Sequence, residues 1–190
     1  MSKRCPWPGD NPLMIEYHDL EWGVPLHNDR KIFEFMVLDA FQAGLSWAIV
    51  LKKREGFREA FDNFEPEKIA RYSEKKIQKI LTDPAIIRNK LKVYATVTNA
   101  KQFLAVQKEF GTFDKYIWQF TGGKTIHNKW KHLKQVPAKT KESDAMSKDL
   151  LQRGFKFVGS TICYAFMQAA GMVNDHMTYC NHYKKVKLGK

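Results

Sequence analysis

The sequence predicts an all-α protein. Apolar residues recur at the three- and four-residue spacing of a helix through most of the chain, and no segment alternates as a half-buried strand does. Asparagine, aspartate or serine stands before several of these periodic segments, where a helix cap belongs. With 190 residues and no internal repeat, the chain is expected to form one domain, or one domain with an appendage.

Cap and stop residues set the expected helix boundaries. Asn11 before Pro12 is a cap followed by proline at the first helical position. Ser46 is expected to cap a helix that Gly56 interrupts, and Gly154 is expected to stop a later one. The expected helices, in order, cover residues 12–18, 29–43 after Asn28 or Asp29, 47–54, 57–61, a short segment from Pro66, 74–81 after Ser73, 88–110, 113–120, the segment from the Ser143 cap to Arg153, and 161–170 after the Ser160 cap.

Two segments are expected to lie outside the helical core. Residues 121–139 contain two glycines, several lysines and Pro137, a composition typical of a long exposed loop. Residues 183–190 carry four lysines and are expected to form a mobile basic tail.

The charge balance favours an anionic partner. Lysine and arginine number 32 against 20 acidic residues, which gives a net charge of +12 and favours nucleic acid or a membrane surface. No apolar run is long enough to cross a bilayer, and the sequence shows no secretory leader pattern. Because Cys5, Cys163 and Cys180 do not make a disulfide framework, we expect a reducing, cytoplasmic setting without membrane association.

The stretch from Leu38 to Trp47 places a carboxylate, Asp39, directly after an apolar helical run. A carboxylate in such a run is costly unless it has a partner. Trp47, at the start of the next helix, could form a wall of the space that the carboxylate faces. The alternative is that Asp39 caps the next turn or lies on a solvated edge.

Four aromatic residues surround Asp39 in the sequence: Trp7, Tyr17, Trp22 and Trp47. Flat rings around a carboxylate suit a planar, electron-poor or cationic ligand through stacking and cation–π attraction. An ordinary aromatic core is the alternative interpretation.

Cysteine and histidine pairs at the two ends of the chain suggest a metal site. Cys5 and His18 lie near the start, and His176 and Cys180 lie four residues apart near the end, on one face if that turn is helical. Two cysteines and two histidines match a tetrahedral structural zinc site. The alternative is two buried thiols and two surface imidazoles, and Cys163 is expected to be a core thiol.

A basic helical hairpin is predicted around residues 73–104. Residues 83–87 join its two helices, and such a connection can offer backbone N–H groups to a phosphate. The cationic and polar residues that follow are Arg88, Asn89, Lys90 and Lys92, and a second positive cluster is Lys52, Lys53 and Arg54. Ala85 and Ile87 stand where glycine would help most, so a helical hairpin with a solvated basic face is the alternative.

Together these features resemble the 3-methyladenine DNA glycosylase I family, from Cys5 to Cys180. The motifs that carry the resemblance are 17–19 (YHD), 21–25 (EWGVP), 42–47 (QAGLSW), 50–54 (VLKKR), 86–88 (IIR), 150–159, which ends in GFKFVG, and 174–176 (NDH). The resemblance implies a helix-hairpin-helix fold in residues 1–182, with a structural zinc that ties segments 1–20 and 172–182 together.

The resemblance also implies the function and its residues. The family hydrolyses the N-glycosidic bond of 3-methyladenine in alkylated double-stranded DNA and so releases the free base, and the nucleotide must first be flipped out of the duplex. The implied zinc ligands are Cys5, His18, His176 and Cys180, and the implied base pocket is Trp7, Tyr17, Trp22, Asp39 and Trp47. Gly44 and Leu45 match the loop that fills the vacated stack, while Lys52, Arg88 and Lys90 are expected to contact the DNA backbone.

Two departures from the family concern the pocket: Asp39 stands where glutamate is usual, and Met14 replaces an aromatic residue seen in some members. We expect Asp39 to read the base edge, because a base that is cationic when attached leaves readily without strong acid catalysis. No matched lysine nucleophile is present, so we expect no lyase step, and we expect a monomer. A non-catalytic binder of damaged or bent DNA and, less favoured, a zinc-stabilised RNA-binding module are the competing hypotheses.

Overall fold

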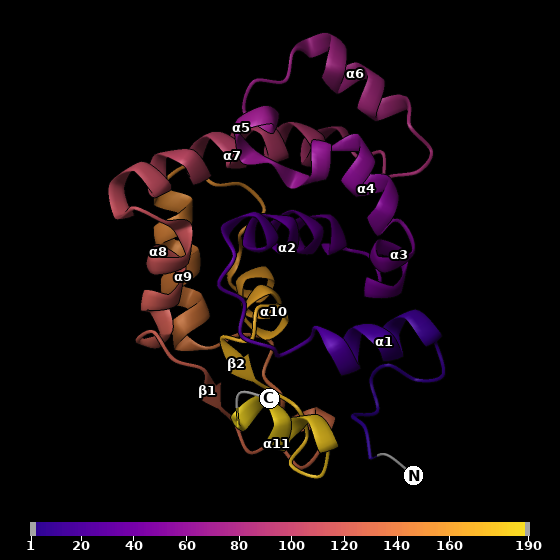
Figure 1. Cartoon of the computed structure of the whole chain (residues 1–190), viewed down its shortest axis with the longest axis vertical. Coiled ribbons are helices and arrows are strands. Elements are labelled where there is room, and N and C mark those ends of the chain that lie inside the picture. Colours follow the sequence, from indigo (N-terminus) through magenta and orange to yellow (C-terminus); the bar gives the residue numbers. More distant parts are fainter. Residues whose placement is uncertain (1–2, 189–190) are drawn as a thin grey trace.

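The computed structural model describes residues 3–188 and is mostly helical, as the sequence predicts (Figure 1). Its α-helices are α1 (Pro12–Leu20), α2 (Asp29–Gln42), α3 (Trp47–Lys52), α4 (Arg54–Ala60), α5 (Pro66–Ile69), α6 (Glu74–Thr82), α7 (Lys90–Phe110), α8 (Phe113–Trp118), α9 (Lys141–Gln152), α10 (Ser160–Ala169) and α11 (Asn181–Lys187). Three short 3₁₀ helices, η1 (Asp62–Phe64), η2 (Gln119–Thr121) and η3 (Leu133–Gln135), and two strands, β1 (Ile126–His127) and β2 (Val173–Asn174), complete it. Among residues 3–188, no helix is long and apolar enough to cross a membrane.

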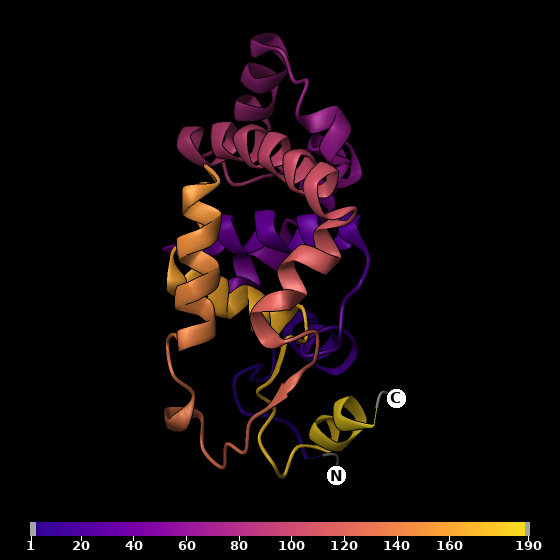
Figure 2. The same cartoon turned by 90° about the vertical axis from the view of Figure 1, so that its left-hand side faces the viewer.

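Helix α2 is the centre of the molecule. Asn28 caps it by accepting a hydrogen bond from the backbone N–H of Lys31, and residues 32–41 are all buried. This segment is apolar except for Glu34 and Asp39, so neighbouring elements must cover it on every side. Figures 1 and 2 show α7 on one side of α2 and α10 on the other. The last turns of this covered helix carry Asp39, whose backbone is therefore held rigidly.

The predicted hairpin is formed by α6 and α7, which begin after caps at Ser73 and Asn89. The connection between them packs against α4, where a Cβ on Gly56 would lie 2.6 Å from the Cβ of Ala85. The prediction that Gly56 interrupts a helix is therefore wrong: the break lies at Lys53, and Gly56 lies within α4. Glycine is required there because the hairpin connection approaches the helix closely.

Two predicted caps are misplaced by a few residues. Thr140, not Ser143, caps α9, and Ser143 is the reciprocal partner three residues later that donates to and accepts from Thr140. Ser160 is the first residue of α10, which follows Gly159.

The tail and the long loop are more ordered than the sequence predicts. Residues 181–187 form α11, and the side chain of Val186 is buried, so the expectation of a mobile tail is wrong there; residues 189–190 lie outside the described part. Within 121–139, β1 pairs in parallel with β2, which aligns Ile126 with Val173. Each strand has only two residues, which is too short to show an alternating pattern in the sequence.

Candidate active site

A cavity of about 210 Å³ opens where α1, α2, α3 and α10 meet the loop between β1 and α9. Its lining residues are Trp7, Met14, Tyr17, Trp22, Asp39, Gln42, Trp47, Leu133, Val136, Ala165, Gln168 and Asp175. The structure therefore brings together all five residues that the sequence assigned to a pocket. The lining is mainly aromatic and aliphatic with a few polar groups, which is the usual character of a small-molecule site.

Three residues that line this cavity each carry a buried polar atom with no hydrogen-bond partner. These atoms are Nε1 of Trp7, Nε1 of Trp47 and Oδ2 of Asp39, and no other buried side-chain nitrogen or oxygen among residues 3–188 is left unpaired. Leaving a buried polar group unpaired costs about 1–3 kcal/mol, so such groups are rare in folded proteins. Two donors and one acceptor that meet in one cavity indicate a ligand with the complementary acceptors and donor.

Asp39 lines this cavity and is almost fully withdrawn from solvent, with 3% of the residue exposed. The alternative that Asp39 lies on a solvated edge is therefore wrong. Burial raises the pKa of Asp39 well above its ordinary value. The pKa of the neighbouring Tyr17 is also raised, first by burial and then by the charge of Asp39. An ionised Asp39 is therefore unfavourable in the empty cavity, and a cationic ligand would stabilise its negative charge.

The aromatic residues form two connected walls. The rings of Tyr17 and Trp47 lie 5.2 Å apart between centroids and are tilted by 51°. Trp7 packs edge-on against Trp22 at 5.0 Å, and these two rings also contact the histidines behind the cavity. Trp7 lies 5.3 Å from the ring of His18, and Trp22 lies 4.7 Å from that of His176. One wall of the cavity is thus built directly on the cysteine–histidine cluster.

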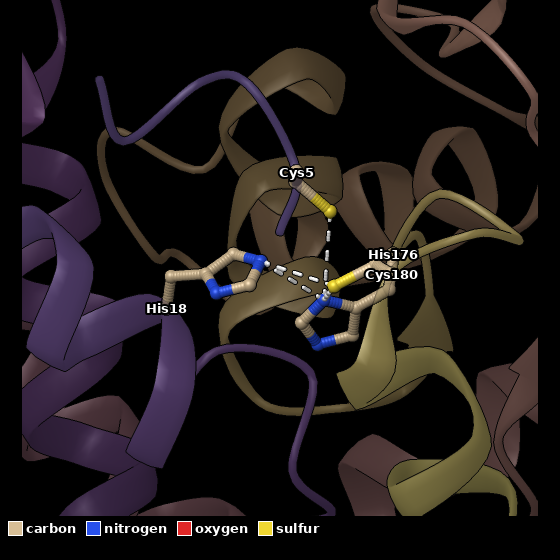
Figure 3. A group of neighbouring side chains, drawn as sticks. All are labelled: Cys5, His18, His176 and Cys180. Atoms are coloured by element: carbon tan, nitrogen blue, oxygen red, sulfur yellow. Dashed lines mark hydrogen bonds between the residues drawn. The ribbon is translucent and has the colours of Figure 1, made fainter. Parts of the chain in front are cut away.

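The four predicted metal ligands converge on one buried point, as Figure 3 shows. The sulfur of Cys5 lies 3.7 Å from Nδ1 of His176, and the sulfur of Cys180 lies 3.7 Å from Nε2 of His18 and 3.8 Å from Nδ1 of His176. The two facing ring nitrogens are 3.2 Å apart. A tetrahedral zinc site with ordinary bond lengths has edges of about 3.3–3.8 Å, so these distances are compatible with a metal site.

Hydrogen bonds on the far side of each ring leave the facing nitrogens free to bind a cation. Nδ1 of His18 lies 2.7 Å from Oδ1 of Asp19, and Nε2 of His176 lies 3.0 Å from the carbonyl oxygen of Trp22. Because both partners only accept, these two nitrogens carry the ring hydrogens that the hydrogen bonds require. The facing nitrogens are thus the ones that can bind a cation. Arg4 in turn donates to both carboxylate oxygens of Asp19 and lowers its pKa.

The chain reaches this cluster differently from what the sequence suggests. His176 and Cys180 do not share a helical turn: both lie in the connection between β2 and α11, and Cys180 caps α11. Their spacing of four residues therefore does not explain why they meet.

Asp175 is a functional candidate that sequence reasoning missed. One carboxylate oxygen accepts from the side chains of Asn128 and Trp130, both at 2.7 Å, and the other accepts from Tyr164 at 2.7 Å and Gln168 at 2.8 Å. Asp175 lines the cavity, and its charge, unlike that of Asp39, is fully hydrogen-bonded. Its position beside His176 in the 174–176 motif was the available signal.

The loop after α2, between the lining residues Gln42 and Trp47, exposes Leu45. Gly44 has a φ of +81°, which favours glycine, and Leu45 is 40% exposed. Lys92 fixes this loop, because its ammonium group donates to the carbonyl oxygens of Phe41 at 2.8 Å and Ala43 at 2.7 Å. Lys92 is therefore buried, and the prediction that it belongs to an exposed basic face is wrong.

The remaining predicted cations divide into exposed and paired groups. Lys52, Arg88 and Lys90 are exposed, on α3 and at the hairpin. Arg54 is not: its guanidinium group is buried and donates to Glu34 and Glu21, at 2.7 Å each. The second positive cluster therefore loses Arg54.

Further lining residues come from segments that the sequence analysis did not connect with the pocket. Leu133 and Val136 come from the loop that was expected to be merely exposed, and Ala165 and Gln168 come from α10. No local pattern marks them, because they reach the cavity only through tertiary packing.

Comparisons with known proteins agree with this geometry. The methyladenine glycosylase family model matches residues 7–183. The chain is 47% identical over 180 residues to the DNA-3-methyladenine glycosylase of Haemophilus influenzae, covering 95% of this chain and 97% of that protein. It is 44% identical over 181 residues to DNA-3-methyladenine glycosylase 1 of Escherichia coli K12, with the same coverage.

Solved structures show the same fold. A crystal structure of 3-methyladenine DNA glycosylase I superposes with a TM-score of 0.92 at 46% identity and covers 94% of this chain and 98% of that one. The Staphylococcus aureus enzyme, described for its recognition of 3-methyladenine, superposes with a TM-score of 0.91 at 34% identity and covers 94% and 95%. The chain belongs to the methyladenine glycosylase family.

Proposed function

We propose that this protein is a base-excision repair glycosylase that hydrolyses the N-glycosidic bond of 3-methyladenine in alkylated DNA. The curated relatives carry this activity in their names, and one structural neighbour, with a TM-score of 0.91, holds 3-methyladenine. The observation that carries the proposal is the set of three unpaired polar atoms in one aromatic cavity.

The chemistry of the base matches that set. The amino group of 3-methyladenine can donate to Oδ2 of Asp39, and its ring nitrogens can accept from Trp7 and Trp47. Tyr17 and Trp47 offer faces for stacking. While attached to the sugar the damaged base is cationic, which cation–π attraction and the Asp39 carboxylate both favour. Normal adenine lacks this charge, so selectivity follows from the same contacts.

The positive charge also weakens the bond to be broken. The base departs as a neutral molecule, so the reaction needs little help from a general acid. The main work of Asp39 is therefore to read the base edge and to attract its charge. Water attacks the sugar, and no lysine lines the cavity among the described residues. Lys92, the buried lysine nearby in α7, is engaged with two carbonyl groups. These observations support a monofunctional enzyme without a lyase step.

Access to the cavity requires that the nucleotide leave the duplex. Leu45, exposed on its glycine turn, is suited to fill the vacated stack, and Lys92 holds its loop in place. We assign α6 and α7 to a helix-hairpin-helix element whose connection meets the DNA backbone. Arg88, Lys90 and the more distant Lys52 are exposed and supply positive charge. These contacts carry no base sequence information.

The metal that we assign to Cys5, His18, His176 and Cys180 is zinc, one ion per chain. Four protein ligands leave no open position, so the ion is structural and closes the two chain ends into one domain of residues 1–182. Cavity, hairpin and cluster all come from one chain, which supports action as a monomer. The absence of a disulfide among Cys5, Cys163 and Cys180 supports a reducing compartment such as the cytoplasm.

Release of free base from methylated duplex DNA tests this function directly. The expected result is release of 3-methyladenine by the wild-type protein without strand cleavage. Binding of the duplex without release would instead favour the non-catalytic binder, and stronger binding of RNA than of duplex DNA would favour the RNA-binding module.

A further inference from the structure

One long segment of the chain has no acidic residue. Residues 115–141 contain no aspartate or glutamate, and six lysines fall within 122–141. Two of these, Lys139 and Lys141, form ion pairs with acids at the start of α9. Lys129, Lys131 and Lys134 are exposed and form no ion pair within residues 3–188. Three unneutralised charges within six residues make this loop strongly positive.

The loop that carries these lysines is held rigidly. The side chains of Asn128 and Trp130 donate to the buried Asp175, and the carbonyl oxygen of Trp130 accepts from the backbone N–H of Thr178 at 2.9 Å. The side-chain oxygen of Gln135 accepts from the backbone N–H groups of Lys131 and His132, at 2.8 and 3.0 Å. These contacts fix the backbone positions of the three lysines, so binding does not first have to order the loop.

The loop also borders the cavity. Leu133 lies between two of the lysines and lines the cavity, as does Val136. Figure 2 shows the segment between β1 and α9 at the end of the molecule opposite α6, so the cavity lies between this loop and the hairpin. A DNA strand whose nucleotide enters the cavity carries a phosphate on each side of that nucleotide.

We propose that Lys129, Lys131 and Lys134 bind backbone phosphates of the strand whose nucleotide enters the cavity, on the side away from the hairpin. This inference rests on the proposed function, because it takes DNA as the substrate. The hairpin would then hold the strand on one side of the extruded nucleotide and the loop would hold it on the other. Holding both sides opposes return of the nucleotide to the stack.

The test compares two triple variants of equal charge. In the first, Lys129, Lys131 and Lys134 become Gln; in the control, Lys108, Lys115 and Lys148 become Gln, on α7, α8 and α9. The last two of these helices lie on the side of the molecule opposite α1 and α3 (Figure 1). The probe is a short duplex with one abasic-site analogue, and its Kd is measured across a salt series.

We expect the slope of log affinity against log salt to become shallower by about 0.9 for each lost phosphate contact, hence by roughly 2–3 in the loop variant. The control should keep the wild-type slope and its base-release activity. Equal slopes in the two variants, or an unchanged slope in the loop variant, would overturn the inference. A wild-type protein that binds the duplex but releases no base would refute the proposed function, while the slopes would still decide the role of the loop.

Discussion

Replacement of Asp39 by asparagine should make the protein more stable at neutral pH while it weakens base recognition. The carboxyl oxygen Oδ2 is buried without a partner, and burial raises the pKa of Asp39. A carboxyl whose pKa is higher in the folded than in the unfolded state contributes stability at low pH that is lost as the pH rises through the folded value. Asparagine has nearly the same shape and does not ionise.

The size of the effect follows from the environment of the side chain. An unpaired buried charge costs more than an unpaired neutral amide, by about 1 kcal/mol or more. For a chain of this size, 1 kcal/mol corresponds to about 2–4 °C in Tm. We therefore expect Asp39→Asn to raise Tm by at least that amount near pH 8, with a smaller gain near pH 5. The functional expectation is weaker selection of 3-methyladenine over adenine, with measurable base release retained.

Thermal unfolding across this pH range, together with single-turnover base release, decides the matter. Asp175→Asn is the matched control, because its carboxylate accepts four hydrogen bonds in the same cavity. An amide there leaves donors unpaired and should lower stability by about 2–5 kcal/mol. If Asp39→Asn is less stable than wild type near pH 8, or if its gain does not grow with pH, the reasoning fails. Loss of chemistry with unchanged base binding would make Asp39 a chemical catalyst.

Three further outcomes are expected. Cys180→Ser should lose stoichiometric zinc in elemental analysis and several kcal/mol of stability in chemical denaturation, with a smaller loss of activity per folded molecule; full zinc retention would contradict the ligand assignment. Arg88→Ala should weaken binding to all duplex sequences alike and reduce the salt slope by about 1 in titrations, whereas a sequence-dependent loss would argue against a phosphate contact. Lys92→Met should leave the carbonyl groups of Phe41 and Ala43 unpaired and cost about 2–4 kcal/mol in denaturation, while Lys101→Met, at an exposed position of α7, should cost little.

Local signals predicted the helices well. Asn28, Ser73 and the Asn11–Pro12 pair mark real helix starts, because a cap and the turn that it satisfies are neighbours in the chain. The stretch from Leu38 to Trp47 also stands out locally, because a carboxylate interrupts its apolar pattern. That pattern alone left open whether Asp39 is buried or solvated, and the pocket assignment came from the family resemblance.

Residues whose partners are distant in the chain were misread. Lys92 resembles its exposed neighbours in the sequence, but its ammonium group contacts a carbonyl group 51 positions away. Arg54 follows two lysines in the sequence and so resembles a DNA contact. In the folded protein its guanidinium group instead pairs with Glu34. Charge alone does not indicate burial, because partners that satisfy a charge come from other elements.

The wall of Trp7 and Trp22 has a consequence for how the enzyme is made. Trp7 packs on His18 and Trp22 packs on His176, and the contact between Cys5 and His176 spans 171 positions. Closing so long a loop is entropically costly and slow, so a nascent chain can complete its helical centre long before the two ends meet. A polypeptide that stops short of His176 would keep the hairpin, the exposed leucine and both tryptophans, yet lack the histidine on which Trp22 packs. We therefore expect the base-recognising wall to form late in folding, when this long-range contact closes.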